Sequence, residues 1–237
     1  MTSRNPWLTV AALSLAVLSL TAAPAQAVVI LDLTEHITSS PSEFSPILPA
    51  GSPPWATATF AQNGANTVRL TMAANLQDDL EFISAWLFNF NPAKDASLLV
   101  ESFVASESDI EASSFNSSGS PSGNFIVGDG GRYDIRFNFS AASGSRLEGM
   151  LVSVYDLMLP GLLETDFDFF SEPQGAHDLF KSAAHVQGVT FEDSPSLGSA
   201  WIGAENPTPP IPEPSTVILL GLGLAGLGLF ARRKSAK

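Results

Sequence analysis

Glu213 stands between Pro212 and Pro214, and this short segment is the strongest candidate for chemistry in the chain. Each proline fixes its φ angle and has no backbone N–H to donate. The Glu213 carboxylate is therefore displayed on a stiff backbone that makes few hydrogen bonds of its own. Such a segment suits an enzyme that reads extended main chain and one carboxylate at a membrane surface. The chemistry predicted here is processing of this chain by another enzyme.

The residues around Pro212 to Pro214 predict a stalk and a membrane anchor. Five prolines fall between residues 207 and 214, so residues 204–215 are expected to form an extended linker of polyproline II type. Residues 216–231 carry no charge and would extend about 24 Å as a helix, so we expect a single transmembrane helix. The basic residues Arg232, Arg233 and Lys234 then place residues 232–237 in the cytoplasm and the preceding body on the other side.

The N-terminal segment predicts a secretory signal peptide at residues 1–27. Arg4 supplies the positive start, and residues 8–20 are almost wholly Ala, Leu and Val. Ala25 and Ala27 provide the small side chains that a signal peptidase requires, which places cleavage after Ala27. Both ends of the chain thus predict an exported body.

Residues 212–234 closely resemble the PEP-CTERM protein-sorting signal. The matching features are Pro-Glu-Pro, then Ser215-Thr216, a Leu/Gly span and Arg-Arg-Lys. The resemblance implies a Gram-negative bacterium in which an exosortase recognises the motif and cuts the tail. It implies an inner-membrane-anchored precursor with a periplasmic body, which then reaches the cell surface or the extracellular space in an exopolysaccharide-linked system. Similar tails are also known as the C-terminal segment of ice-binding proteins, a likeness that concerns only the tail.

Charge and composition limit what the body can bind. Residues 28–214 hold six basic residues and all 24 acidic residues, a net charge of −18. We expect no nucleic acid partner, because phosphate binding needs a basic surface. The chain has no cysteine, which excludes disulfides and thiolate chemistry, and its three histidines make a His-rich metal site improbable.

Residues 28–203 are predicted to form one all-β domain, an antiparallel β-sandwich with jelly-roll-like connectivity. Tyr133, Ile135, Phe137 and Phe139 alternate with polar residues, which puts these four side chains on one face of a strand. The sequence pattern also predicts strands with both faces apolar at 82–90 and 151–159, a hairpin closed by 128–131, and closing strands at 186–191 and 199–202. A short helical segment is expected at 179–184.

Catalytic signatures are weak in the body. The Gly119–Gly123 segment puts Pro121 where the nucleophile of a Gly-x-Ser-x-Gly elbow would stand. A Ser-His-Asp triad would have to use His36, His177 or His185, and nothing in the spacing selects one. A glycosidase pair of carboxylates stays open, because its two members can lie far apart in sequence.

Calcium is the one metal that the acidic residues make plausible, although we expect no cofactor. Carboxylates at i and i+2 in an extended chain share a face and can chelate. No spacing matches an EF-hand loop, so a solvated acidic surface explains the same residues. The candidate clusters are Asp166 with Asp168, Asp78 with Asp79 and Glu81, and Glu107 with Asp109 and Glu111.

Aromatic and threonine side chains provide candidates for carbohydrate or ice binding. Trp55, after Pro53-Pro54, is expected to be exposed, Trp86 is expected in the core, and Trp201 is left open. His185 is expected to hydrogen-bond within the fold. The threonine candidates for a flat ice-facing array are Thr57 with Thr59 and Thr67 with Thr71.

These observations predict an exported, non-catalytic surface or extracellular-matrix protein of a polysaccharide-rich envelope or biofilm. Its expected partners are an exosortase, signal peptidase and the export machinery, the membrane through residues 216–231, and exopolysaccharide. The alternatives are an exported carbohydrate-active hydrolase and a carbohydrate- or ice-binding module.

Overall fold

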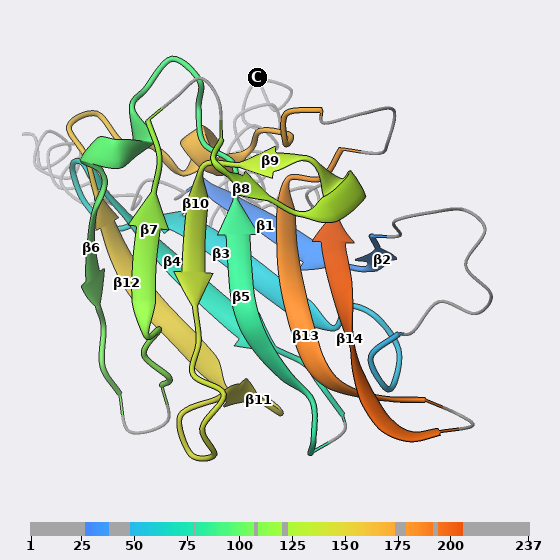
Figure 1. The fold of residues 1–237 in the computed structure, drawn as a ribbon. Helices are drawn as coiled ribbons and strands as arrows, with labels where there is room; N and C mark the ends of the chain where they lie inside the picture. The colour runs from blue at the N-terminus through green and yellow to red at the C-terminus, as the bar shows by residue number, and fades with distance from the viewer. Residues whose placement is uncertain are drawn as a thin grey trace, which may run out of the picture. The chain divides into compact units, whose positions relative to one another are not determined.

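All pairings between the named strands are antiparallel in the computed structural model, which describes residues 27–37, 48–77, 79–106, 109–119, 123–173, 179–191 and 194–205. The strands build two large sheets that lie one behind the other in Figure 1. Within the described residues there is no α-helix and no helix able to cross a membrane. Several predicted segments lie outside that part of the chain: Ala25, residues 206–215 of the linker, the predicted span and the basic tail.

The first sheet has five strands. Its order is β1–β3–β4–β12–β6, so the β3–β4 hairpin lies between β1 and β12. Alternation places buried side chains on the inner face of these strands and half-exposed ones on the outer face. The bounds are β1 (Val28–Leu33), β3 (Ala56–Gln62), β4 (Thr67–Ala74), β6 (Val100–Phe103) and β12 (Val152–Met158).

The second sheet has seven strands. Its order is β2–β14–β13–β5–β10–β7, and β11 also pairs with β5. A separate two-stranded sheet, β8–β9, and three short 3₁₀ helices complete the described structure. The sheet strands are β2 (Glu35–His36), β5 (Phe82–Phe88), β7 (Ser114–Ser117), β10 (Ile135–Asn138), β11 (Leu147–Glu148), β13 (Ser182–Phe191) and β14 (Ser194–Ala204). The remaining elements are β8 (Phe125–Ile126), β9 (Arg132–Tyr133), η2 (Ala96–Leu98), η3 (Gly128–Gly130) and η4 (Glu164–Phe167).

A chain of aromatic rings joins the two sheets through the main core. Phe60 of β3 meets Phe88 of β5 edge-on, with centroids 5.2 Å apart. Phe88 contacts Phe137 of β10, which lies 4.9 Å from the ring of Tyr155 on β12. Phe167 of η4 stacks on Phe60 at 4.3 Å. Since these rings come from both sheets, the aromatic contacts hold the sandwich together without a disulfide.

A second, smaller core lies on the outer face of the seven-stranded sheet. Ala85, Leu87 and Ala183 point outward from β5 and β13 and are buried. Val127 and Tyr133, from the β8–β9 segment, lie in the same cluster. This explains why β5 is apolar on both faces, as the sequence predicts: each face of the strand has its own core.

The sequence prediction for residues 133–139 is wrong in one respect. The strand is interrupted at Asp134, which is buried and accepts a hydrogen bond from Phe90 N (2.9 Å). Tyr133 therefore belongs to the second core, while Ile135, Phe137 and Phe139 belong to the main core. The predicted hairpin is confirmed, because β8 and β9 pair on either side of Gly128–Gly130.

Two further local predictions are corrected. The helix expected at 179–184 does not form, because β13 begins at Ser182. Ser182 and Ala184 lie beside the large rings of Phe88 and Trp86 on β5, and only small side chains fit there. β12 is buried on one face only: Ser153, Tyr155 and Leu157 face the core while the intervening side chains are half-exposed.

The all-β antiparallel prediction is thus confirmed, and the two sheets enclose a common core as a sandwich does. The other predicted strands are present, although β13 and β14 are longer than expected. The jelly-roll connectivity stays a prediction.

Gly188 provides a test of how closely the backbone of β13 packs against Leu80, just before β5. It occupies a β-bulge with φ +81°, and an added Cβ would lie well inside 3.0 Å of the Leu80 carbonyl oxygen. Gly144 has the same φ of +81° but open space around it. We expect Gly144→Ala to lower the free energy of unfolding by about 1 kcal/mol, from backbone strain alone.

For Gly188→Ala we expect a loss at least about 2 kcal/mol larger, because the backbone of Leu80 would also have to move. Urea unfolding followed by tryptophan fluorescence measures both variants. Equal losses would contradict the close backbone contact.

Candidate functional site

The chain leaves the body at one defined end of the sandwich. Glu205 follows β14 and is the last described residue. The sorting motif and the stop-transfer residues therefore lie beyond the described structure: Pro212, Glu213, Pro214, Arg232, Arg233 and Lys234. Ala27, the residue before the predicted cleavage point, directly precedes β1. The region that the structure does describe next to the sorting motif is therefore the end of the sandwich around Ala204.

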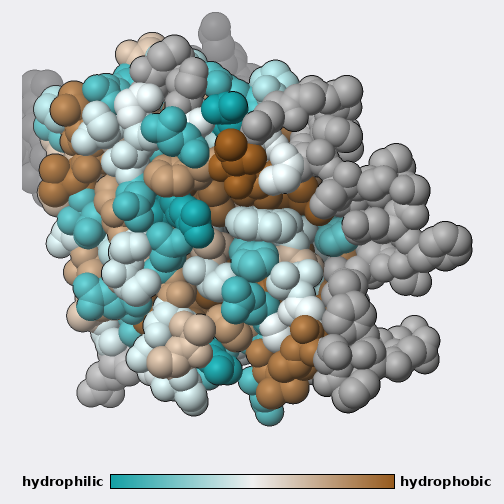
Figure 2. All heavy atoms as spheres, in the orientation of Figure 1, coloured by the Kyte–Doolittle hydropathy of each residue, from teal (hydrophilic) through white to brown (hydrophobic). Residues whose placement is uncertain are grey.

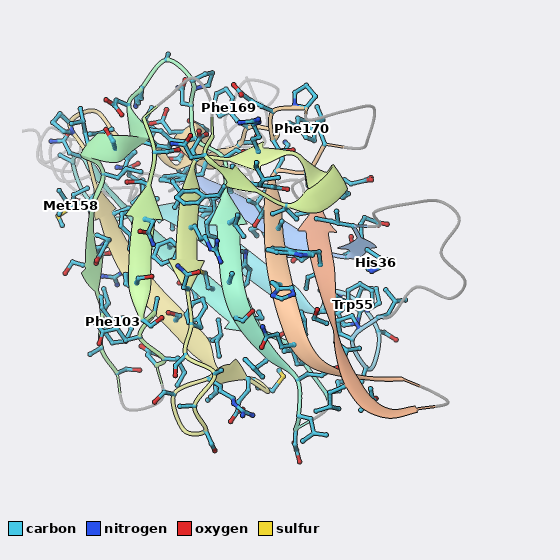
Figure 3. All side chains as sticks on the ribbon, viewed as in Figure 1. His36, Trp55, Phe103, Met158, Phe169 and Phe170 are labelled. Atoms are coloured by element: carbon cyan, nitrogen blue, oxygen red, sulfur yellow. The ribbon has the colours of Figure 1, made fainter. Side chains whose placement is uncertain are left out.

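Three loops surround the exit of the chain, and we call them, with Ala204, the linker-proximal end: residues 89–99, 123–133 and 159–173. Lys181 N donates to Ala204 O (2.8 Å), and Ser171 N donates to Phe180 O (2.8 Å). Arg132 and Glu172 exchange two backbone hydrogen bonds, which join the second loop to the third. Figure 3 shows Phe169 and Phe170 at this end of the molecule.

Asp166 ties the first and third loops together. Its carboxylate forms an ion pair with Lys94 and accepts from Asn91 Nδ2 and Leu163 N, both at 2.8 Å. Burial alone would raise the pKa of Asp166, but the hydrogen bonds from Lys94, Asn91 and Leu163 together lower it below its ordinary value. The side chain is therefore a charged structural centre at neutral pH.

Asp168 is also neutralised by a lysine. Its Oδ1 lies 2.6 Å from Lys181 Nζ, and that ammonium also lies over the Phe170 ring, 4.9 Å from its centroid. The predicted calcium pair Asp166–Asp168 is thus divided between two lysines. The structure does not bring these two carboxylates together as metal ligands.

The other acidic clusters are only partly described. Asp78 and Glu107 lie outside the described residues. Glu81 is fully buried, and its Oε1 accepts from Ala50 N (2.8 Å). Asp109 and Glu111 line a polar depression of about 580 Å³ together with Ser113, Ser140 and Ser145. Among the residues whose placement is described, no three potential ligands of the His, Cys, Asp and Glu types gather as a metal site.

His185 hydrogen-bonds within the fold, as the sequence predicts. Its Nδ1 lies 2.9 Å from Ser84 Oγ, and Ser84 Oγ also donates to the His185 carbonyl (3.2 Å). Both contacts are satisfied when Nδ1–H donates to Ser84, an arrangement in which the ring does not act as a base toward the hydroxyl. Burial, and then the positive charge of Arg136, lower the pKa of His185. His36 lies on β2, and His177 is outside the described residues.

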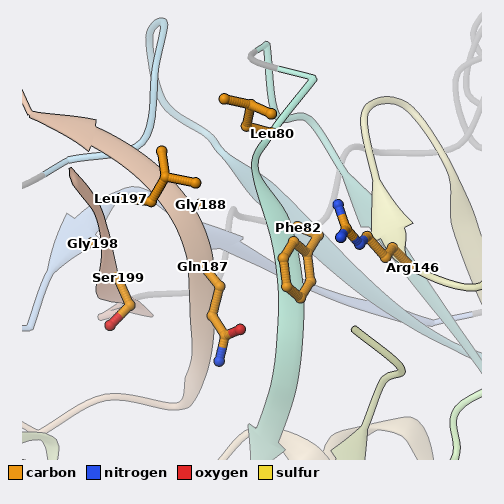
Figure 4. Close-up of a pocket in the computed structure, with 8 residues that line it drawn as sticks. All are labelled: Leu80, Phe82, Arg146, Gln187, Gly188, Leu197, Gly198 and Ser199. Carbon is orange, nitrogen blue, oxygen red and sulfur yellow. The ribbon is translucent and has the colours of Figure 1, made fainter. Parts of the chain in front are cut away.

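A groove of about 480 Å³ lies at the opposite end of the seven-stranded sheet (Figure 4). Arg146 covers the Phe82 ring, with its guanidinium carbon 4.6 Å from the centroid. This groove has an aromatic side chain and no carboxylate in its lining, whereas the depression around Asp109 and Glu111 has carboxylates and no aromatic side chain. The carboxylates of Asp109 and Glu111 and the ring of Phe82 thus line different depressions.

The tryptophans differ from the predictions in one case. Trp55 is not exposed: it is 4% accessible and belongs to the main core, and its backbone N donates to Leu33 O (3.1 Å). Trp86 lies in the core, as expected, and its Nε1 donates to Ser182 Oγ (2.9 Å). Trp201 is half-buried and stacks on His185 with centroids 4.6 Å apart. One face of that indole is therefore already occupied.

The threonine candidates meet on the outer face of the five-stranded sheet. Thr59 pairs directly with Thr71 across β3 and β4. Thr57 donates to Asp32 Oδ1 (2.8 Å), so its hydroxyl is engaged within the protein. Thr67 pairs with Met158 at the end of β12. The threonines thus form a single direct pair and not a regular array.

Sequence reasoning missed Asn91 and Lys94, which organise the linker-proximal end around Asp166. They lie 75 and 72 residues from Asp166 in the chain. No local pattern in the sequence marks such a contact. Only the sandwich topology brings the two loops together.

Comparison with known protein families gives one match. Residues 210–234 match the family described as the PEP-CTERM protein-sorting motif, in agreement with the resemblance found in the sequence. The chain carries this motif, which implies an exosortase-sorted, exported protein with a membrane-anchored precursor in Gram-negative cells. Comparison with curated proteins and with solved structures gave no match.

The Asp166 network leads to a pH-dependent prediction. We expect Asp166→Asn to lower the free energy of unfolding at pH 7 by about 2–3 kcal/mol, because it leaves the partly buried Lys94 without its counter-charge. The folded-state pKa of Asp166 is lowered, so its contribution is complete above the unfolded value of about 3.9 and is lost as the pH falls through the folded value. The difference from wild type should therefore shrink below about pH 4.

Asp156→Asn is the matched control, since Asp156 also has a lowered pKa but pairs with the more exposed Arg69. Its cost should stay below about 1 kcal/mol. Denaturant unfolding between pH 7 and pH 2.5 measures both. A larger loss for Asp156→Asn would show that Asp166 is not the structural centre of this end.

Proposed function

We propose that this chain, which carries a PEP-CTERM sorting motif, is a non-catalytic cargo protein that acts at the cell surface or in the extracellular matrix. The match at residues 210–234 is the observation that supports the proposal most strongly. A sorting tail delivers whatever precedes it, so the function of the whole protein is that of its body after delivery. The body is an acidic β-sandwich with a filled interior.

The interior and the grooves of the body support a structural or adhesive role. The core is closed by aromatic contacts between the sheets, and the two described grooves separate carboxylates from aromatic side chains. Ser84 and His185 are arranged for a mutual structural contact rather than for nucleophilic attack. These features favour a protein that is exported for its surface and stability.

The delivery route follows from the ends of the sequence. We propose that signal peptidase cuts after Ala27 and that residues 216–231 hold the body on the periplasmic side. The exosortase then cuts near Glu213 and releases the body toward the surface. A net charge of −18 on residues 28–214 would keep the released body from adhering to acidic exopolysaccharide except through specific contacts.

The role of Glu213 can be tested in the native host. We expect Glu213→Ala to leave export intact but to prevent removal of the tail, because the carboxylate displayed between two prolines is lost. Intact-mass spectrometry of the protein recovered from the envelope distinguishes the cut chain from the uncut one.

Glu205→Ala is the matched control, because it removes a carboxylate from the start of the same linker, outside the Pro-Glu-Pro motif. That variant should be processed like wild type. Normal tail removal in Glu213→Ala would refute the role given to this side chain.

A further inference from the structure

We propose that the linker-proximal end of the sandwich rests on the lipid surface of the membrane while the precursor is anchored. This inference rests on the proposed function in one respect, because it requires residues 216–231 to lie in the bilayer. It assigns the membrane interface, and not another protein, as the partner of this end of the body.

The tether is too short for any other end of the body to meet the bilayer. Ten residues, 206–215, separate Glu205 from the predicted span, and they reach about 31 Å when fully extended as polyproline II. β14 has 11 residues and is about 36 Å long. For the opposite end of the body to face the membrane, the linker would have to run back along the whole length of β14. The extended linker is shorter than β14, so it cannot reach that far.

Large apolar side chains protrude from each of the three loops at the linker-proximal end. Leu98 is 62% exposed, Ile126 52%, Leu163 51% and Phe170 47%. Phe170 is placed beside the exit of the chain, because Lys181 lies over its ring and bonds through its backbone to Ala204. In Figure 2 one group of hydrophobic side chains lies in the upper part of the molecule, over β8 and β9, and others lie at the upper left edge and at the lower end.

The loops that carry these side chains are held rigidly. Asp166 joins the loop of Leu98 to the loop of Leu163, and the backbone bonds between Arg132 and Glu172 join the loop of Ile126 to that of Phe170. Burying apolar surface in the interfacial layer of a bilayer is favourable in proportion to the area covered, and side chains fixed beforehand lose little entropy on contact.

Local charge also permits the contact. The net negative charge of the body would repel an anionic bilayer, but Asp166 and Asp168 at this end are each paired with a lysine. Lys94 and Lys181 thus offset two of the four carboxylates in residues 159–173, which lowers the repulsion between lipid headgroups and the loop that carries Leu163 and Phe170. The opposite end also exposes Leu80, Met150 and Leu197, but the tether holds that end away from the bilayer.

A spin-label experiment on the anchored precursor tests the inference. The chain has no cysteine, so Leu163→Cys and Met150→Cys each give one attachment site for a nitroxide. The precursor is produced in a host without an exosortase, which retains the tail, and is reconstituted into vesicles of phosphatidylethanolamine and phosphatidylglycerol. We expect the ratio of collision rates with oxygen and with an aqueous nickel chelate to be several-fold higher at position 163 than at position 150.

A second set of variants separates apolar contact from mere proximity. In the Leu163→Cys background, Phe170→Ser with Ile126→Ser should lower that ratio toward the aqueous value. The matched change at the opposite end, Leu80→Ser with Leu197→Ser, should leave it unchanged. Equal ratios at 163 and 150 in chains that float with the vesicles would overturn the inference and leave the sorting proposal intact. Chains that fail to float would overturn the anchor itself, and the inference with it.

Discussion

The contact of aromatic rings across the two sheets is the interaction on which the rest of this structure depends. Phe60 and Phe88 approach from opposite sheets, and Phe137 and Tyr155 repeat the contact further along. With no cysteine in the chain, burial of these rings is what fixes one sheet against the other. Phe167 stacks on Phe60 and so fixes η4, which in turn places Asp166. The order of the linker-proximal end is therefore an extension of the core.

This arrangement separates two tasks along the chain. The body is stabilised by its own core, and the sorting motif at residues 210–234 lies outside it. On the proposal made above, a rigid end beside the start of the linker would give the anchored precursor a defined surface toward the bilayer, and release of the tail would free the same surface for other contacts.

The sequence allowed the fold class to be predicted because alternation and turn residues are local signals. The two-faced burial of β5 and the hairpin around Gly128–Gly130 followed from them. The errors arose where tertiary packing overrode local preference: the Ala-containing segment predicted as a helix at 179–184 enters β13 at Ser182, and only small side chains fit there beside Trp86. Trp55 is buried in the main core, which no neighbouring residue indicates. The Asp166–Lys94 pair spans too much sequence for any pattern to mark it.

The most direct test of the account is the intact mass of the wild-type protein recovered from outside the cytoplasm of its own host. The account predicts a chain that begins at Val28 and ends near Pro212 to Pro214, without residues 216–237. A full-length chain, uncut at both ends and dissolved inside the cell, would contradict it.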